Sequence, residues 1–285
     1  MTQRRLARGG MRLRCRLIAL LAVTLSPIAC AQTLLSGDDQ NVVNFAFATQ
    51  LGSGVYSVSG RTLQIYRLPF RHELKSASDS DLGVVLTLPV TFGFYDFELQ
   101  DVANGDIPTS VDAISFVPGL ELVFEVKSDW SLSPYVEAGF SKARDVDADI
   151  AVYSGGLVSL YEFGNQEIDW QLRNDLTFAG VDLHGPGGSS HFTRFQSVVT
   201  ARRPISARLG LDGLAYALND YYVDQPDGPV DSADRRGDSL QYEVGLTLGT
   251  SETRRVWGIP LPRVGIGYRF GSDLDAWRIV FGTPY

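Results

Sequence analysis

The stretch GVVLTLPVTFGFYDF (83–97) decides the fold class, because large apolar residues occupy every second position along it. Such alternation is typical of a β-strand that presents one apolar face. The strand it predicts, residues 83–98, exceeds the ~5–6 residues usual in globular proteins. It reaches the ~9–11 residues that a tilted strand needs to cross a bilayer. The apolar face consists of Val84, Leu86, Leu88, Val90, Phe92 and Phe94.

The same alternation recurs along most of the chain, as in AISFVPGLELVFEV (113–126) and WSLSPYVEAGFSKA (130–143), while helical periodicity is scarce. We therefore expect an all-β fold, a closed antiparallel transmembrane β-barrel of about 12 strands. The predicted strands are 42–50, 55–70 (or from about 61), 83–98, 112–126, 130–143, 149–162, 167–182, 191–202, 205–218, 239–250, 256–270 and 276–285.

Connection lengths favour a barrel over a β-sandwich, which also alternates in sequence. Long and short connections take turns, as they do in outer-membrane barrels. The long ones, expected outside the cell, include 99–111, 184–190 and 219–238. The short ones, expected in the periplasm, include 127–129, 163–166, 202–204 and 250–255. Residues 71–81 and 271–275 do not fit this order, and a secreted sandwich stays open as an alternative.

The first 31 residues read as a secretory signal peptide. Six arginines precede the apolar run LIALLAVTLSPIA (17–29), which is too short for a stable membrane span, and ACA (29–31) offers a cleavage site. We expect a short periplasmic segment over 32–41 and the barrel domain over 42–285. The expected location is the outer membrane of the cell.

Composition excludes several classes of function. Both cysteines, Cys15 and Cys30, lie in the signal peptide, so the mature chain has no thiol for disulfides or metal thiolates. The net charge is −8 and becomes more acidic once six arginines are removed, which argues against nucleic-acid binding. No later stretch approaches the ~18 apolar residues of a transmembrane helix. We expect no cofactor.

The closing stretch DAWRIVFGTPY (275–285) and the preceding RVGIGYRFGSD (263–273) resemble bacterial outer-membrane β-barrels. More narrowly, they resemble the solitary outer-membrane autotransporter-like β-barrel family, over roughly residues 40–285. The resemblance implies a translocator-like barrel without a passenger, and contact with the barrel-assembly machinery, lipid and lipopolysaccharide. It also implies a C-terminal assembly signal at Trp277, Ile279, Phe281 and Tyr285. We expect a monomer.

Charged residues of both signs fall on the face predicted to point inward. They could line a polar channel, or form an internal salt-bridge network, since buried charges need partners. The lumen-lining candidates are Glu121, Glu125, Glu137, Arg173, Asp175, Arg208, Asp212, Glu243, Arg269 and Arg278, with Asp169 and Arg263 on the same face.

Two stretches contain residue types that serve in catalysis or metal binding. His184 and His191 flank GPGGSS, with Asp182, Ser189 and Ser190 nearby, which would permit a Ser/His/Asp site. No G-x-S-x-G elbow accompanies them, so a solvated loop is the simpler interpretation. RDVDADI (144–150) spaces three aspartates for Ca²⁺ but lacks the glycine and glutamate of a calcium loop. We assign no catalytic residue and no metal ligand.

These observations predict a non-enzymatic outer-membrane β-barrel, either a small pore or a structural and surface-interaction element. The alternative is an outer-membrane enzyme acting on lipid or lipopolysaccharide. Fold alone does not decide between them.

Overall fold

A computed structural model describes the chain from residue 53 to residue 283, with gaps, and all described residues belong to one compact unit, Thr33–Tyr285. The described ranges are 53–58, 61–77, 82–95, 113–143, 150–165, 167–183, 189–206, 208–224, 240–250, 255–256, 259–260, 263–271 and 275–283. The strands are β1 (Gly54–Val58), β2 (Arg61–Lys75), β3 (Gly83–Tyr95), β4 (Ala113–Phe116), β5 (Gly119–Lys127), β6 (Trp130–Ala143), β7 (Ile150–Gly164), β8 (Asp169–Leu183), β9 (Ser189–Ser206), β10 (Leu211–Asp224), β11 (Leu240–Thr250), β12 (Arg255–Val256), β13 (Ile259–Pro260), β14 (Val264–Phe270) and β15 (Asp275–Phe281).

The strands form one antiparallel sheet in the order β1-β2-β3-β4-β6-β7-β8-β9-β10-β11-β14-β15, so nearly every strand pairs with its neighbour in sequence. β4 and β5 both lie between β3 and β6 and are two pieces of one strand. The break falls at Val117 and Pro118, because proline has no amide hydrogen to donate to the ladder. The prediction of an all-β antiparallel sheet with about twelve strands is confirmed.

The N-terminal boundaries differ from the prediction. The strand expected at 42–50 lies outside the described residues. Of the two starts predicted for the next strand, 61 agrees with β2 and 55 does not, because residues 54–58 form β1, in which Val58 pairs with Arg61. β2 then continues to Lys75, through residues expected to form a turn.

Two further boundaries moved for local reasons. β9 runs on to Ser206 through the expected turn at 202–204, and β10 begins only at Leu211. Between them Gly210 has a φ of 60°, a left-handed conformation that glycine adopts without strain, so the chain reverses there. The strand expected at 256–270 is divided, since only β14 joins the large sheet, while β12 and β13 pair with each other.

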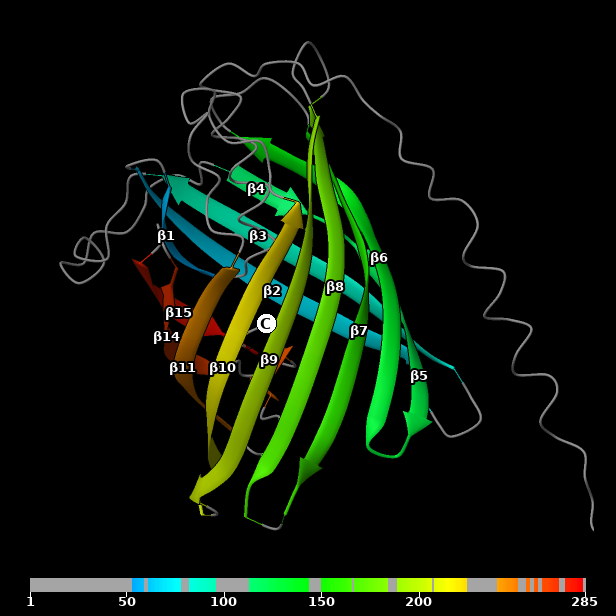
Figure 1. Ribbon diagram of the computed structural model, residues 1–285, viewed down its shortest axis with the longest axis vertical. Coiled ribbons are helices and arrows are strands. Elements are labelled where there is room, and N and C mark those ends of the chain that lie inside the picture. The colour runs from blue at the N-terminus through cyan, green and yellow to red at the C-terminus, as the bar shows by residue number, and fades with distance from the viewer. Residues whose placement is uncertain are drawn as a thin grey trace, which may run out of the picture. The chain divides into compact units, whose positions relative to one another are not determined.

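The sheet bends back toward its own beginning. In Figure 1, β6 to β11 run steeply across the near side and β2 and β3 pass behind them. β1 and β15, the first and last strands of the order, approach each other with Cα atoms within 8 Å. A Cβ atom on Gly282, just after β15, would lie 3.8 Å from Pro69 Cγ on β2. The described hydrogen-bonded order nevertheless ends at β1 and at β15.

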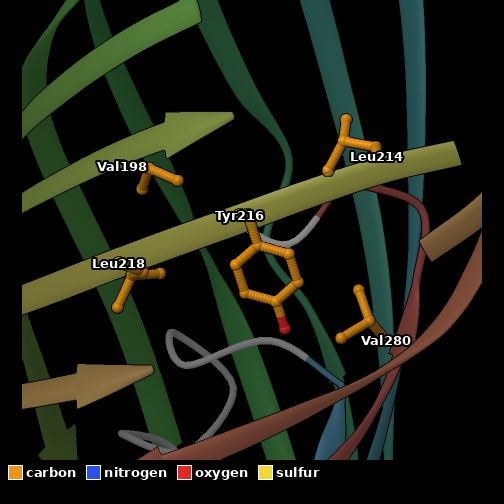
Figure 2. Close-up of a cluster of buried hydrophobic side chains, with 5 residues drawn as sticks. All are labelled: Val198, Leu214, Tyr216, Leu218 and Val280. Atoms are coloured by element: carbon orange, nitrogen blue, oxygen red, sulfur yellow. The ribbon is translucent and has the colours of Figure 1, made fainter. Parts of the chain in front are cut away.

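One side of the sheet carries a buried apolar cluster, drawn in Figure 2, of Val198, Leu214, Tyr216, Leu218 and Val280 from β9, β10 and β15. Tyr216 lies flat against the neighbouring strands because two glycines leave room for its ring. A Cβ atom on Gly245 would lie 2.5 Å from the Tyr216 ring, and one on Gly267 would overlap its hydroxyl. The glycines therefore allow an aromatic side chain to cross three strands.

Candidate functional site

The two faces of the sheet have opposite character to those of a soluble protein. One face, here called the outer face, exposes large apolar side chains, and the other, the inner face, buries polar and charged ones. Exposed residues on the outer face include Val136, Phe140, Leu157, Leu176, Phe195, Val244, Leu246, Ile266 and Trp277. Buried residues on the inner face include Thr91, Ser133, Asp175, Arg194, Gln196, Thr200, Asp212, Asp220, Glu243, Thr247, Arg269 and Arg278.

Glu243 on β11 is the centre of the largest charged group on the inner face. Its side chain is 0% exposed, and it accepts hydrogen bonds from Arg269 Nε at 3.0 Å and Arg278 Nη1 at 2.9 Å. The Tyr216 hydroxyl donates to its other oxygen at 2.6 Å. Strand register brings the groups together, because Glu243 pairs with Arg269, and Gly267, two residues before Arg269, pairs with Arg278.

Asp220 on β10 extends this group toward β9. Its side chain is also 0% exposed and lies 2.5 Å from Arg269 Nη2. Gln196 donates a hydrogen bond to it at 2.9 Å, and Arg194 Nε lies 3.8 Å away. We call the set Arg194, Gln196, Tyr216, Asp220, Glu243, Arg269 and Arg278 the inner charge network.

Charged and apolar levels follow one another along β10. Asp212, near the start of the strand, is paired with Arg263. Leu214 and Leu218 follow on the same inner face, with 7% and 3% of their surface exposed, and Asp220 comes after them. The apolar cluster of Figure 2 thus lies between two levels of ion pairs on β10.

A second group of inward polar residues lies on β6 to β8. The Tyr135 hydroxyl is 2.8 Å from Thr177 Oγ1, and Arg173 is paired with Asp175 at 2.8 Å. Nearby, Glu137 accepts a hydrogen bond from Ser154 at 2.9 Å. Arg71 on β2 contacts Glu121 on β5 at 2.6 Å, and this pair is partly exposed.

The chemistry of these groups is that of charge neutralisation. Burying a carboxylate costs several kcal/mol unless cations and hydrogen bonds compensate it, and here each buried carboxylate meets at least one arginine. The arginines offer a planar fork of donors that can serve two acceptors, as Arg269 serves Glu243 and Asp220. Such an arrangement ties β9, β10, β11, β14 and β15 together and fills the inner face between them.

Of the ten lumen-lining candidates, eight occupy inward positions with ion-pair or hydrogen-bond partners: Glu121, Glu137, Arg173, Asp175, Asp212, Glu243, Arg269 and Arg278. The other two, Glu125 and Arg208, are exposed. Glu125 lies near the end of β5, where the pairing with β6 shifts register, and Arg208 lies in the turn before β10, so the shifted strand boundary explains its position. Asp169 and its partner Arg202 are also largely exposed, at 58% and 46%.

Arg194 and Asp220 are not among the lumen-lining candidates predicted from the sequence. The sequence predicts Asp220 in a connection at 219–238, whereas β10 continues to Asp224. The available signal was period two, since Asp212, Tyr216 and Asp220 share one parity along the strand. Arg194 on β9 has the same inward parity as Gln196. It is not among the predicted candidates because arginine side chains usually lie at the protein surface.

The closing stretch places bulky residues on the outer face. Trp277 is 62% exposed and its ring centroid lies 5.0 Å from that of Tyr268 on β14. Ile279 follows at the same parity and is half-buried. Phe281 is the last residue of β15, and Tyr285 lies outside the described residues.

The residues weighed for catalysis and metal binding are only partly described. His184 and the three aspartates at 145, 147 and 149 lie outside the described residues. Asp182 pairs with Ser189 across β8 and β9, and His191 lies on the same outer face. The His191 ring lies 6.0 Å from that of Phe178. Within the described ranges, no group of three acidic, histidine or cysteine side chains could hold a metal ion.

Comparisons with known proteins give no family for this chain: no family model matches the sequence, and no curated protein matches it. In the part of the chain that is described, no helix has the length and apolar character needed to cross a bilayer.

Proposed function

We propose that the chain forms a closed β-barrel that spans the outer membrane. The observation that carries the proposal is the distribution of side chains over the two faces of the sheet. Leu246 is 63% exposed, whereas Glu243, three residues earlier on the opposite face of β11, is 0% exposed, and this contrast recurs on β4, β6 to β10, β14 and β15. Water would penalise such a surface, whereas hydrocarbon outside and a polar interior would favour it.

Closure of the barrel is part of the proposal. A sheet in lipid has no open edge, because unpaired backbone groups cost several kcal/mol each in hydrocarbon. The approach of β15 to β1, and of Gly282 to Pro69, supports a final pairing between the first and last strands. Such a pairing would explain why the outward parity of Trp277 and Ile279 continues to the end of β15.

Aromatic residues at both ends of the strands support a membrane orientation. Phe163 stacks on Trp170 where β7 gives way to β8, with ring centroids 6.3 Å apart. At the opposite end, Tyr242 near the start of β11 stacks on Phe270 at the end of β14, at 5.7 Å. Aromatic girdles at two levels are characteristic of transmembrane barrels, whose interfacial zones favour amphipathic rings.

We further propose that the barrel is non-enzymatic and resembles an autotransporter translocator without a passenger, exported by the signal peptide of residues 1–31. Its inner charge network and apolar cluster favour a structural barrel, with a filled interior, over an open pore. Lipid and lipopolysaccharide would contact the outer face. The barrel-assembly machinery would read the C-terminal residues.

The proposal is tested by refolding residues 32–285 into lipid vesicles. A folded barrel migrates differently on a gel before and after boiling, and its strands resist added protease. Planar-bilayer recordings then distinguish the two forms of the function. We expect an inserted protein with little steady conductance. Large reproducible conductance would favour a pore, and a protein that stays in the aqueous phase would refute the membrane barrel.

A further inference from the structure

Four polar residues interrupt the apolar outer face in one continuous line across four strands. Ser159 on β7 pairs with Asn174 on β8, Asn174 pairs with Ser197 on β9, and Ser197 pairs with Asn219 on β10. All four are half-buried and have the parity of the exposed apolar residues. We call these four residues the polar row.

The polar row lies within the apolar surface and not at its border. Along β8, Asn174 stands between the outward residues Leu172 and Leu176. Along β9, Ser197 stands between the outward residues Phe195 and Val199. If the sheet spans a membrane as proposed above, these amides and hydroxyls face hydrocarbon, where polar groups are costly and mark functional surfaces.

The hydrogen bonds of the polar row do not use all of its donor groups. Ser197 Oγ donates to Asn174 Oδ1 at 2.7 Å, and Trp130 Nε1 donates to Ser159 Oγ at 2.9 Å. No further hydrogen bond of the Asn174 amide nitrogen, and none of the Asn219 side chain, is found among the described residues. An amide without a partner in an apolar medium costs on the order of 2–7 kcal/mol. A partner outside the chain would remove this cost.

A strip of small outward residues on β10 leads up to the polar row. The outward positions that precede Asn219 are Gly213, Ala215 and Ala217, and Ala201 on β9 pairs with Ala215. Small residues let two membrane-embedded backbones approach closely, so that dispersion contacts and hydrogen bonds can form between proteins. Lipid tails gain little from such a surface. The geometry therefore indicates contact with protein.

We propose that this face of β7 to β10 is the contact surface between two copies of the chain within the membrane, in place of the monomer expected from the sequence. The inference rests on the proposed membrane barrel. A two-fold axis that passes between Asn174 and Ser197 places each amide opposite a hydroxyl of the other copy. Amides and hydroxyls both donate and accept, so the surface is complementary to itself, as a two-fold interface requires.

The test uses single cysteines in the full chain, with Cys15 and Cys30 changed to serine, refolded in vesicles. Ser197→Cys lies next to the proposed axis, so oxidation or a short bifunctional maleimide should join two copies into a covalent dimer. The matched control is Ile266→Cys, which is also outward but lies on β14, two strands beyond β10. We expect crosslinking at position 197 well above that at 266.

A second measurement removes the polar row. The triple variant Asn174→Leu, Ser197→Val and Asn219→Leu should lower the association constant of the dimer at least ~10-fold, measured by sedimentation in detergent or by energy transfer in vesicles. Its boiled and unboiled gel mobilities should still differ, which shows that the barrel itself folds.

The outcomes separate this inference from the proposed function. A protein that fails to insert into vesicles contradicts the membrane barrel. An inserted protein that stays monomeric, with equal crosslinking at 197 and 266, overturns the two-fold contact alone. A stable complex of the cysteine variant with a different membrane protein, but never with its own copy, would overturn it as well.

Discussion

Replacing Glu243 by glutamine tests the inner charge network at its centre. The substitution preserves the size of the side chain and removes its charge. Arg269 and Arg278 then lose the carboxylate that they contact at 3.0 and 2.9 Å. The Tyr216 hydroxyl keeps a neutral oxygen as its acceptor, so packing of the apolar cluster is little changed.

The expected loss follows from burial. Side chains of Glu243 and Arg278 are 0% and 4% exposed, and removing one member of a buried ion pair costs about 3–5 kcal/mol. Glutamine retains one hydrogen-bond acceptor, so we expect a loss near 3 kcal/mol. The matched control is Asp169→Asn, whose pair with Arg202 is 58% and 46% exposed. Exposed pairs contribute about 0–1 kcal/mol, because water already solvates both charges.

The assay is urea unfolding of the refolded protein in lipid vesicles, followed by tryptophan fluorescence, with each variant compared with the parent chain. Combining Glu243→Gln with Arg278→Met gives a double-mutant cycle that isolates the contact of the two side chains. We expect a coupling energy of at least ~1 kcal/mol. A loss below about 1 kcal/mol for Glu243→Gln, or equal losses for it and Asp169→Asn, would refute the reasoning.

Three further changes probe the packing of the inner face and the character of the outer face. Gly267→Ala should lower the unfolding free energy by at least ~1 kcal/mol, because the added Cβ would overlap the Tyr216 hydroxyl. The control Gly271→Ala, whose Cβ would make only ordinary van der Waals contacts, should leave the free energy unchanged in the same urea titration. Tyr216→Phe should cost about 1.5–3 kcal/mol, since a buried hydrogen bond to a carboxylate is lost, and an unchanged titration midpoint would contradict this role. Leu246→Arg should lower the unfolding free energy in vesicles by about 2–4 kcal/mol, whereas Leu209→Arg, in the turn before β10, should change it little. Equal losses at the two positions would contradict a lipid-facing β11.

The alternation of apolar and polar residues at every second position was sufficient to predict the strand interiors. It also predicted on which face most of the charged residues lie. Glu137, Asp175 and Arg269 lie on the inner face because parity persists along a strand whatever its exact ends. Boundaries were less predictable where the turn depends on one residue. Gly210 ends the reversal before β10, and the pairing of Val58 with Arg61 divides a segment in which the alternation is continuous.

The partners of the inward charges could not be predicted from parity. Arg269 and Asp220 are 49 residues apart and meet only because β10, β11 and β14 are adjacent in a particular register. The polar row has the same origin. Ser159, Asn174 and Ser197 look like isolated polar residues until the register places them side by side.

Lipid accessibility along β11 tests the membrane barrel most directly. Single cysteines at each position from 241 to 248, with a fluorescent label, would be exposed in vesicles to a quencher dissolved in the lipid tails and to one dissolved in water. We predict strong lipid quenching at the outward positions 242, 244, 246 and 248 and weak quenching at the inward ones, with a period of two. Stronger quenching from water than from lipid at these outward positions would contradict the account.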